Sequence, residues 1–241
     1  MQVKTEGIVL HQIKYSETSI ISTIYTRSHG RLSFLLQGVR KKGAKIKANL
    51  LQPLFLLNIE MYYKSNRQLQ KVKEISNYTP FQSIPYDFKK RTIALFLGEM
   101  LYKTLKEEES NPSLFDYIFN HIQILDLKDT GLSNFHIYFL VHLTKYLGFF
   151  PNANYDKTNK FFDLKKGAFV RFRPNHEFVM DEVESRYFAQ FLQHSSNQLA
   201  KETIPHKTRQ QIIEKLINFY YIHNPGLSSI KSFDVLKEIF Q

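Results

Sequence analysis

The residues best suited to chemistry form a basic run in the first third of the chain. Residues 37–47 read QGVRKKGAKIK, in which five cations fall within eight residues and two glycines are interspersed. Lys and Arg take phosphate oxygens as point or forked contacts, and glycine allows a backbone to approach a ligand closely. The run predicts a phosphate-binding loop; the alternative is a loop that is only solvated.

Further cations flank two expected turns, residues 28–30 and residues 64–67. We therefore expect the following cations to bind DNA: Arg27, Arg31, Arg40, Lys41, Lys42, Lys45, Lys47, Lys64 and Arg67. Phe34, Tyr62 and Tyr63 lie nearby in the sequence and are candidates for stacking on bases. The alternative for each of these aromatic residues is a place in the core.

The charge of the chain is concentrated around these residues. Residues 1–80 carry 13 Lys and Arg against 4 Glu, whereas the remaining 161 residues carry 20 cations against 18 acids. A basic block of domain length suggests a densely anionic partner, and nucleic acid fits because neutralised phosphates release condensed counterions. A domain that is merely basic is the alternative.

Composition excludes several classes of protein. The chain has no Cys, so a disulfide framework and a thiolate zinc site are excluded, as expected for a reducing cytosol. The N-terminus lacks the pattern of a signal peptide, and no apolar run reaches the length of a membrane span. We expect a soluble, cytoplasmic protein with no membrane partner.

The elements that must position the cations change type along the chain. β-branched and alternating patterns predict five strands over residues 3–13, 18–26, 31–36, 54–63 and 69–75, with a bend or bulge at Gly7. Five short strands in about 75 residues match a small OB-type barrel. After Pro80, helical spacing predominates over residues 87–106, 111–125, 133–147, 183–192, 208–223 and 232–240.

The change of period coincides with the change of charge. We therefore predict an α+β chain of two domains: residues 1–80 form a five-stranded OB-type barrel, and residues 81–241 form a mainly helical domain. Residues 150–178 are irregular within the second domain.

The order of several short motifs resembles the RecO family of bacterial recombination mediators. The N-terminal part of the resemblance rests on TEGIVL at residues 5–10, YSE at 15–17, YTR at 25–27, Gly30, GVRK at 38–41 and LQPL at 51–54. LGFFP at residues 147–151 matches the middle of the family. YYIH at 220–223, GL at 226–227, IKS at 230–232 and VL at 235–236 match its C-terminal segment. The resemblance spans the whole chain in the order of the family.

The resemblance implies a function that needs no covalent chemistry. RecO-like proteins have an N-terminal OB fold and a helical C-terminal domain, bind single- and double-stranded DNA, and anneal complementary strands. They contact the acidic C-terminal tail of single-stranded-DNA-binding protein (SSB) and, with RecR, help to load RecA onto SSB-coated strands. The resemblance thus implies a bacterial protein that associates with the nucleoid when it acts.

One departure from the family is clear. Many RecO relatives carry four Cys after the LGF-P segment that form a structural zinc site, whereas this chain has none. We expect a zinc-free variant in which Phe161, Phe162, Phe169 and Phe172 replace the metal by packing. We expect the acidic tail to be bound by cations that lie beside apolar helices, namely Arg171, Arg173, Lys207 and Arg209.

Enzymatic patterns are weak. GLSSIKS at residues 226–232 lacks the glycine and the preceding strand of a phosphate-binding loop. A nuclease would need clustered carboxylates for metal, and residues 1–80 hold only four, widely spaced. We expect no catalytic site, metal or cofactor; an RNA- or ribosome-associated OB protein with a helical interaction domain remains the alternative function.

Overall fold

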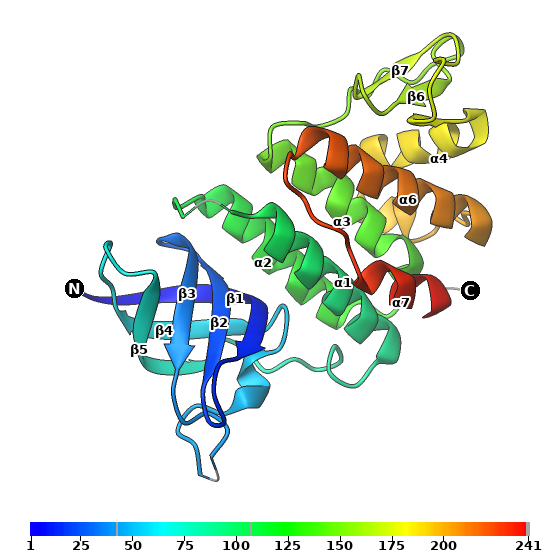
Figure 1. Cartoon of the computed structure of the whole chain (residues 1–241). Helices are drawn as coiled ribbons and strands as arrows, with labels where there is room; N and C mark the ends of the chain where they lie inside the picture. The colour runs from blue at the N-terminus through cyan, green and yellow to red at the C-terminus, as the bar shows by residue number, and fades with distance from the viewer. Residues whose placement is uncertain (42, 107, 240–241) are drawn as a thin grey trace. The chain divides into compact units, whose positions relative to one another are not determined.

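The computed structural model describes residues 1–41, 43–106 and 108–239 (Figure 1). The N-terminal elements are β1 (Gln2–Lys14), β2 (Ile20–Thr26), β3 (Gly30–Leu36), the 3-10 helix η1 (Ala48–Leu51), β4 (Leu56–Tyr62) and β5 (Leu69–Asn77). The helices are α1 (Phe88–Thr104), α2 (Pro112–Leu127), α3 (Leu132–Tyr146), α4 (Glu182–Gln193), α5 (Ser196–Leu199), α6 (His206–His223) and α7 (Ser232–Ile239). Three short strands lie between α3 and α4, namely β6 (Phe161–Asp163), β7 (Ala168–Val170) and β8 (Val179–Met180).

The first five strands close into a barrel in the order β1-β2-β3-β5-β4. Neighbouring strands are antiparallel except β3 and β5, which pair in parallel at Ser33–Leu69 and Phe34–Gln70 and so complete the ring. Each strand ends within two residues of its expected bounds. The OB-type barrel followed by helices, predicted from the sequence, is confirmed.

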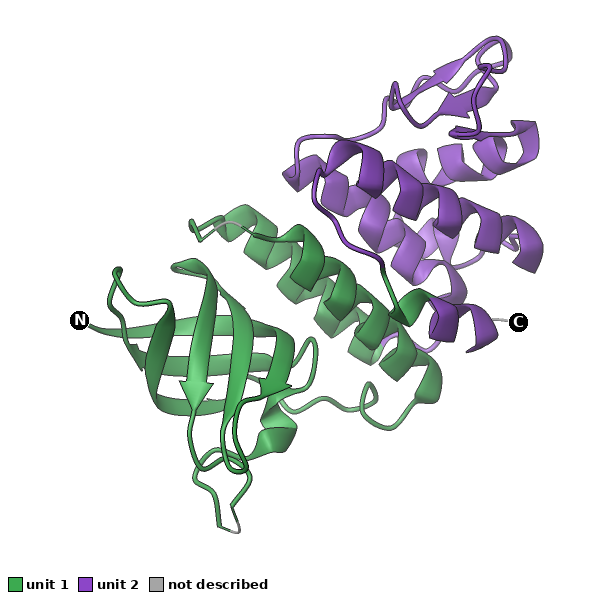
Figure 2. Ribbon diagram, in the orientation of Figure 1, with its two compact units in different colours: residues 1–127, 230–233 green, residues 128–229, 234–241 purple. Residues whose placement is uncertain are grey.

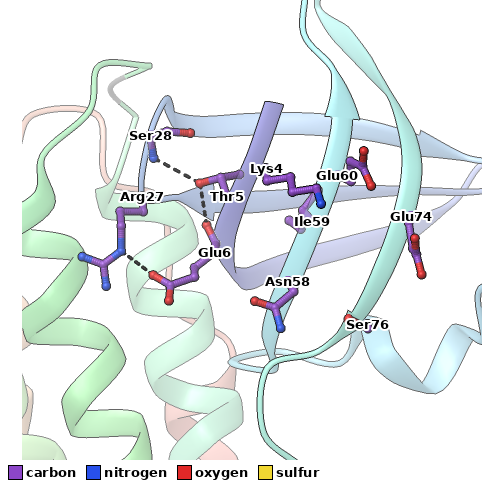
Figure 3. A pocket seen from close by; sticks show the side chains of 10 residues that line it. All are labelled: Lys4, Thr5, Glu6, Arg27, Ser28, Asn58, Ile59, Glu60, Glu74 and Ser76. Atoms are coloured by element: carbon purple, nitrogen blue, oxygen red, sulfur yellow. Dashed lines mark hydrogen bonds and ion pairs between the residues drawn. The ribbon is translucent and has the colours of Figure 1, made fainter. Parts of the chain in front are cut away.

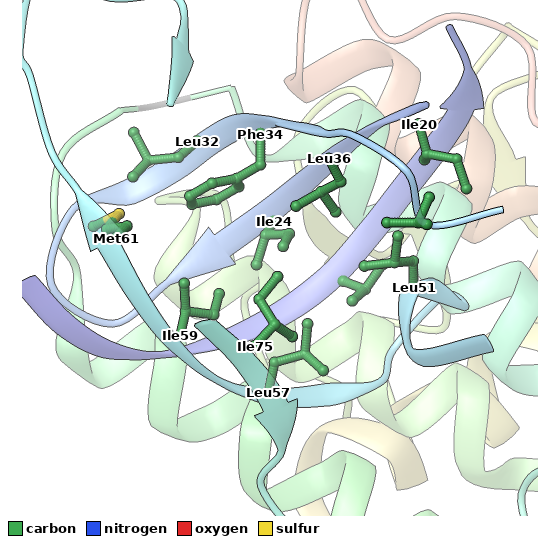
Figure 4. Packing of buried hydrophobic residues seen from close by; sticks show 12 residues of the cluster. Ile20, Ile24, Leu32, Phe34, Leu36, Leu51, Leu57, Ile59, Met61 and Ile75 are labelled. Carbon is green, nitrogen blue, oxygen red and sulfur yellow. The ribbon is translucent and has the colours of Figure 1, made fainter. Parts of the chain in front are cut away.

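Alternate residues of the strands fill the barrel (Figure 4). Ile20 and Ile24 of β2 and Phe34 of β3 are almost completely buried in this core. Phe34 is therefore a core residue rather than a base-stacking platform. The side chains on the opposite face of β2 and β3 point away from the barrel core and can pack on other elements.

The bulge expected at Gly7 lies further along β1, because the register with β2 shifts between Val9 and His11. A Cβ atom at Gly7 would lie 2.6 Å from Cδ1 of Ile59 and 2.7 Å from Cγ2 of Ile24. Glycine thus occupies this position because core side chains already fill the space beside it.

Two compact units divide the chain (Figure 2). Unit 1 comprises Met1–Leu127 together with Ile230–Phe233, so it holds the barrel, α1 and α2. Unit 2 comprises Lys128–Ser229 and Asp234–Gln241. The chain therefore passes from unit 1 to unit 2, returns for four residues, and ends in unit 2.

The short return segment is attached to α1 by Glu99. The Glu99 carboxylate accepts hydrogen bonds from the Lys231 amide at 3.1 Å, the Ser232 amide at 2.7 Å and the Ser232 hydroxyl at 2.6 Å. Lys103 pairs with the same carboxylate at 2.7 Å. Burial opposes ionisation of Glu99, but these donors outweigh it and lower its pKa to about 2.

Unit 2 combines helices with the small sheet, whose strand order is β7-β6-β8. Phe162 of β6 packs on Phe188 of α4 with ring centroids 4.7 Å apart, and on Phe219 of α6 at 5.8 Å. The buried Tyr220 hydroxyl donates to the Leu140 carbonyl at 2.7 Å and so links α6 to α3. No α-helix among the described residues has both the length and the apolar character needed to cross a bilayer.

Candidate nucleic-acid interface

The basic loop, residues 37–47, connects β3 to η1 and is attached to the barrel at two points. Val39 is only 4% exposed and belongs to the barrel core, and Ile46 packs against the same core. Gly38 and Gly43 adopt positive φ values of 73° and 77°, which only glycine adopts easily. The sequence thus folds the segment into a defined turn that presents its cations outward.

The cations of the basic loop are available to a ligand. Arg40, Lys41, Lys45 and Lys47 are all exposed, and among the described residues none of them forms an ion pair. Lys42, which was predicted with them, lies outside the described residues. The carboxylates that would neutralise such a loop are absent from its described contacts, so the positive charge is directed to solvent.

The loop between β1 and β2 lies beside the basic loop. The Arg40 amide donates to the Thr18 carbonyl at 3.4 Å, and the Tyr15 amide donates to the Ser19 carbonyl at 3.0 Å. Tyr15 is 61% exposed and follows the exposed Lys14. Sequence reasoning missed Tyr15 as a stacking candidate, although an aromatic residue after Lys14, between two predicted strands, was a signal for it.

The turn between β4 and β5 carries Lys64 and Arg67 at the other end of the barrel. Buried Gln70 fixes this turn, because its side-chain amide donates to the carbonyls of Lys64 and Arg67 at 2.8 Å each. Six residue steps along β3 separate the two ends, a distance of about 20 Å. The cations of the basic loop and those of this turn therefore form two separate exposed groups.

Arg27 and Arg31 contact helical elements of unit 1. Arg27 pairs with Glu6, and with Asp116 of α2 at 2.6 Å. Arg31 donates to the carbonyls of Tyr102 at 2.7 Å and Leu105 at 2.5 Å, where α1 ends. These contacts stabilise unit 1, and the expectation that both arginines also bind DNA stays a prediction.

The two tyrosines that the sequence suggests for base stacking, Tyr62 and Tyr63, lie at the C-terminal end of β4. Tyr62 is 46% exposed, whereas Tyr63 is partly buried and packs on His29 with ring centroids 4.0 Å apart. Burial lowers the pKa of His29, so this pair favours a neutral imidazole. Tyr62 is the more accessible of the two.

A groove of about 520 Å³ lies on the outer face of the barrel over β1, β4 and β5 (Figure 3). Glu6, Glu60 and Glu74 line it together with the cations Lys4 and Arg27. It gathers three of the four carboxylates that are widely spaced in the sequence of residues 1–80. Because carboxylates repel phosphate, this face is less suited to DNA than the two exposed groups of cations.

The cations expected to receive an acidic tail are dispersed in unit 2. Arg171 and Arg173 follow β7 and are exposed, whereas Lys207 and Arg209 lie in the first turns of α6. Arg209 is partly buried and donates to the Ile204 carbonyl at 3.2 Å. No described contact joins the two pairs of residues.

The region of residues 150–178, where phenylalanines were expected to replace a zinc site, is held by aromatic packing and side-chain hydrogen bonds. Phe162 and Phe169 are buried, as expected for the replacement of a metal, but Phe161 is partly exposed and Phe172 is 74% exposed. The expected packing role of Phe172 is therefore wrong. The Asn154 side chain instead holds this region together, since its amide donates to the Phe169 carbonyl and accepts from the Phe169 amide, both at 2.9 Å.

The described residues hold no group of three or more His, Asp or Glu side chains placed to bind a metal ion. The structure therefore offers an OB-type barrel with exposed cations, joined to a helical region. That combination defines a class of nucleic-acid-binding protein with a barrel as its binding module.

Comparison with known proteins identifies the family to which this chain belongs. The family described as Recombination protein O N terminal matches residues 1–81, and that described as Recombination protein O C terminal matches residues 85–232. The chain belongs to the RecO family, whose role lies in DNA repair and recombination.

Several similar proteins are called DNA repair protein RecO. Those of Phocaeicola vulgatus and Bacteroides fragilis are each 37% identical to this chain, over 240 and 241 residues. That of Flavobacterium psychrophilum is 35% identical over 241 residues. In all three comparisons the match covers 100% of both chains.

Proposed function

We propose that this protein binds single- and double-stranded DNA and anneals complementary strands. We further propose that, with RecR, it helps to load RecA onto SSB-coated single strands, and that it acts on DNA at the bacterial nucleoid. Family membership supports a role in DNA repair and recombination. The finer activities are proposals that rest on the cations of the barrel.

The observation that carries the proposal is the basic loop. Its cations are exposed and unpaired among the described residues, while Val39 and Ile46 hold its backbone against the core. Cations near two strands screen phosphate repulsion, so complementary bases can meet without covalent chemistry. Lys64 and Arg67 form a second exposed group about 20 Å away, which suits a strand that runs along the barrel.

An annealing assay tests the proposal most directly. Two complementary oligonucleotides, one labelled, are mixed with the full chain in the absence of metal and ATP. We expect faster duplex formation than without protein, and intact strands at the end. No acceleration, or cleavage of the strands, would contradict the proposal, and a clear preference for RNA strands would favour an RNA-associated function.

The basic loop makes a quantitative prediction. Replacing Lys41, Lys45 and Lys47 by Ala removes three expected phosphate contacts, so the slope of log affinity against log salt should fall by about 2 on single-stranded DNA. Fluorescence anisotropy over a range of salt concentrations measures this slope.

A matched variant controls for net charge. Replacing exposed Lys89, Arg91 and Lys201 by Ala removes the same charge from other parts of the chain. The slope of this variant should stay close to that of the unmodified protein. Equal slopes for both triple variants would show that the basic loop is only solvated.

We propose that the helical region binds the acidic tail of SSB. An acidic peptide with an apolar end needs a cationic rim, for which Arg171, Arg173, Lys207 and Arg209 are the candidates. Calorimetry of the full chain with a synthetic tail peptide should show binding that weakens with salt and on replacement of Lys207 and Arg209 by Ala. Absence of binding would remove this part of the proposal and leave DNA annealing intact.

A further inference from the structure

An exposed aromatic ring flanked by two arginines protrudes from unit 2 directly after β7. Phe172 is 74% exposed, and the Arg171 guanidinium lies over its ring, 5.1 Å from the centroid. Arg171 and Arg173 are themselves exposed and form no ion pair with any described residue. A base stacked on this ring would remove part of its apolar surface from water.

The base of this element is buried and hydrogen-bonded, although its tip is exposed. β7 pairs with β6, and Phe169 is buried and clamped by Asn154. The Lys160 amide donates to the Val170 carbonyl at 3.1 Å, one residue before Arg171. Residues 171–173, which we call the RFR tip, are thus held outside the hydrophobic core by a fixed strand pair.

The surroundings of the RFR tip are locally basic within a nearly neutral domain. Residues 152–178 contain six Lys and Arg against three acids. Two of these acids are occupied by the backbone: Asp156 accepts from the amides of Thr158 and Asn159, and Asp163 accepts from those of Lys165 and Lys166. The six cations outnumber the three acids, so the segment presents a net positive charge to a ligand, although Lys160 pairs with Glu182 at 3.4 Å.

We propose that the RFR tip is a second binding element for single-stranded DNA, in which Phe172 stacks on a base and Arg171 and Arg173 contact phosphates. Stacking on an aromatic ring is tolerant of sequence, and cations on both sides of the ring match the spacing of base and backbone. The ring protrudes, whereas an acidic peptide with an apolar end needs a pocket to enter. The inference rests on the proposed DNA binding and adds a contact for DNA outside the barrel.

This inference reassigns Arg171 and Arg173 from the acidic tail to DNA. Lys207 and Arg209 remain the candidates for the tail. A second contact at the RFR tip would favour annealing, because a protein with two separate DNA contacts can hold one strand at each of them.

The absence of Trp from the chain allows a direct test. Phe172→Trp introduces a single indole at the tip, and a stacked base should quench its fluorescence. The full-length variant is titrated at low salt with an oligothymidylate of about 15 nucleotides, while anisotropy follows binding in parallel. Tyr86→Trp is the matched control, since Tyr86 is 82% exposed and stands three residues before the exposed Lys89 in unit 1.

We expect saturable quenching of the tip indole in step with binding, and little change at position 86. Phe172→Ala should weaken single-strand binding roughly fivefold to a hundredfold, and Phe172→Tyr should restore it. The high exposure of Phe172 makes all three substitutions compatible with folding.

The possible failures are distinguishable. Binding by anisotropy without quenching at position 172 would overturn the RFR tip as a DNA contact and leave the proposed function intact. A response of the indole to the acidic tail peptide but not to DNA would show that the tip is a peptide site, which also overturns the inference. If the unmodified protein binds no DNA, both the inference and the proposed function fail.

Discussion

Arg31 shows how one side chain can support the barrel and a helix at the same time. Its guanidinium donates to two carbonyls at the C-terminal end of α1 and lies 4.6 Å from the centroid of the Tyr102 ring. The last carbonyls of a helix have no partner within it, and a cation favours this negative end of the dipole. Arg31 therefore connects β3 to the C-terminal end of α1.

Replacing Arg31 by Ala should reduce the free energy of unfolding by about 1–3 kcal/mol, because both hydrogen bonds from its Nη1 and the contact with the Tyr102 ring are lost. Urea denaturation measures the loss. If the role of Arg31 is structural, the salt slope of DNA binding stays unchanged in the same variant. A reduced slope with unchanged stability would instead support the phosphate contact predicted from the sequence.

The roles of single residues were the least predictable part of the site. The sequence identified the basic loop, because a run of cations between two glycines is visible without a structure. It did not show that Arg27 and Arg31 contact helices, since those partners lie more than 70 residues away along the chain. Only the structure shows that Phe34 is a buried core residue and that Tyr15 is exposed and open to stacking, because the periodicity of the sequence does not distinguish the two roles.

At the scale of elements, the link between α1 and the return segment depends on one ionised carboxylate. Glu99 has its pKa lowered to about 2 by Lys103 and Ser232 against the opposing effect of burial. Because the folded pKa is lower than that of an unfolded Glu, the stabilisation is present above about pH 4.5 and is lost as the pH falls through 2. The shift corresponds to about 3 kcal/mol.

Glu99→Gln should therefore destabilise the protein at neutral pH by up to about 3 kcal/mol, and stability should depend less on pH between 5 and 2. Urea unfolding at several pH values measures both effects. Glu108→Gln changes an exposed carboxylate and should leave the pH dependence intact. Identical profiles for Glu99→Gln and the unmodified protein would contradict the role of this carboxylate.

Element types were predictable where their period was strong. β2 is rich in β-branched residues and the long helices repeat at helical spacing, so their bounds fell close to expectation. The bulge in β1 was placed at Gly7 because glycine is common at bulges, whereas the glycine is required by Ile24 and Ile59 from other strands. The four-residue helix α5 is too short to produce a period and was not predicted, although Ser195 and Gln198 have the spacing of a capping box.

At the scale of the whole molecule, the boundary predicted near residue 80 is still a prediction. The family matches meet between residues 81 and 85, where strands give way to helices. The compact unit nevertheless continues through α2, because helices cover the outer face of the barrel. Tyr25, for example, is 2% exposed and packs on Phe115 of α2.

Fragments test where the autonomous domain ends. A fragment of residues 1–80 exposes Tyr25 and other buried residues outside the barrel core, and each such side chain costs roughly 1.5–3 kcal/mol. We expect residues 1–127 to unfold at higher urea than residues 1–80, and both to retain weak DNA binding. Equal urea midpoints would favour a domain that ends near residue 80.

The return of Ile230–Phe233 to unit 1 imposes an order on events during protein synthesis. The ribosome makes roughly 5–20 residues per second, so about 5–20 s pass between the completion of Leu127 and that of the return segment. During this interval the nascent barrel and its two helices exist with Glu99 unpaired by Lys231 and Ser232. The first part of the protein to be translated is therefore among the last to reach its full set of contacts.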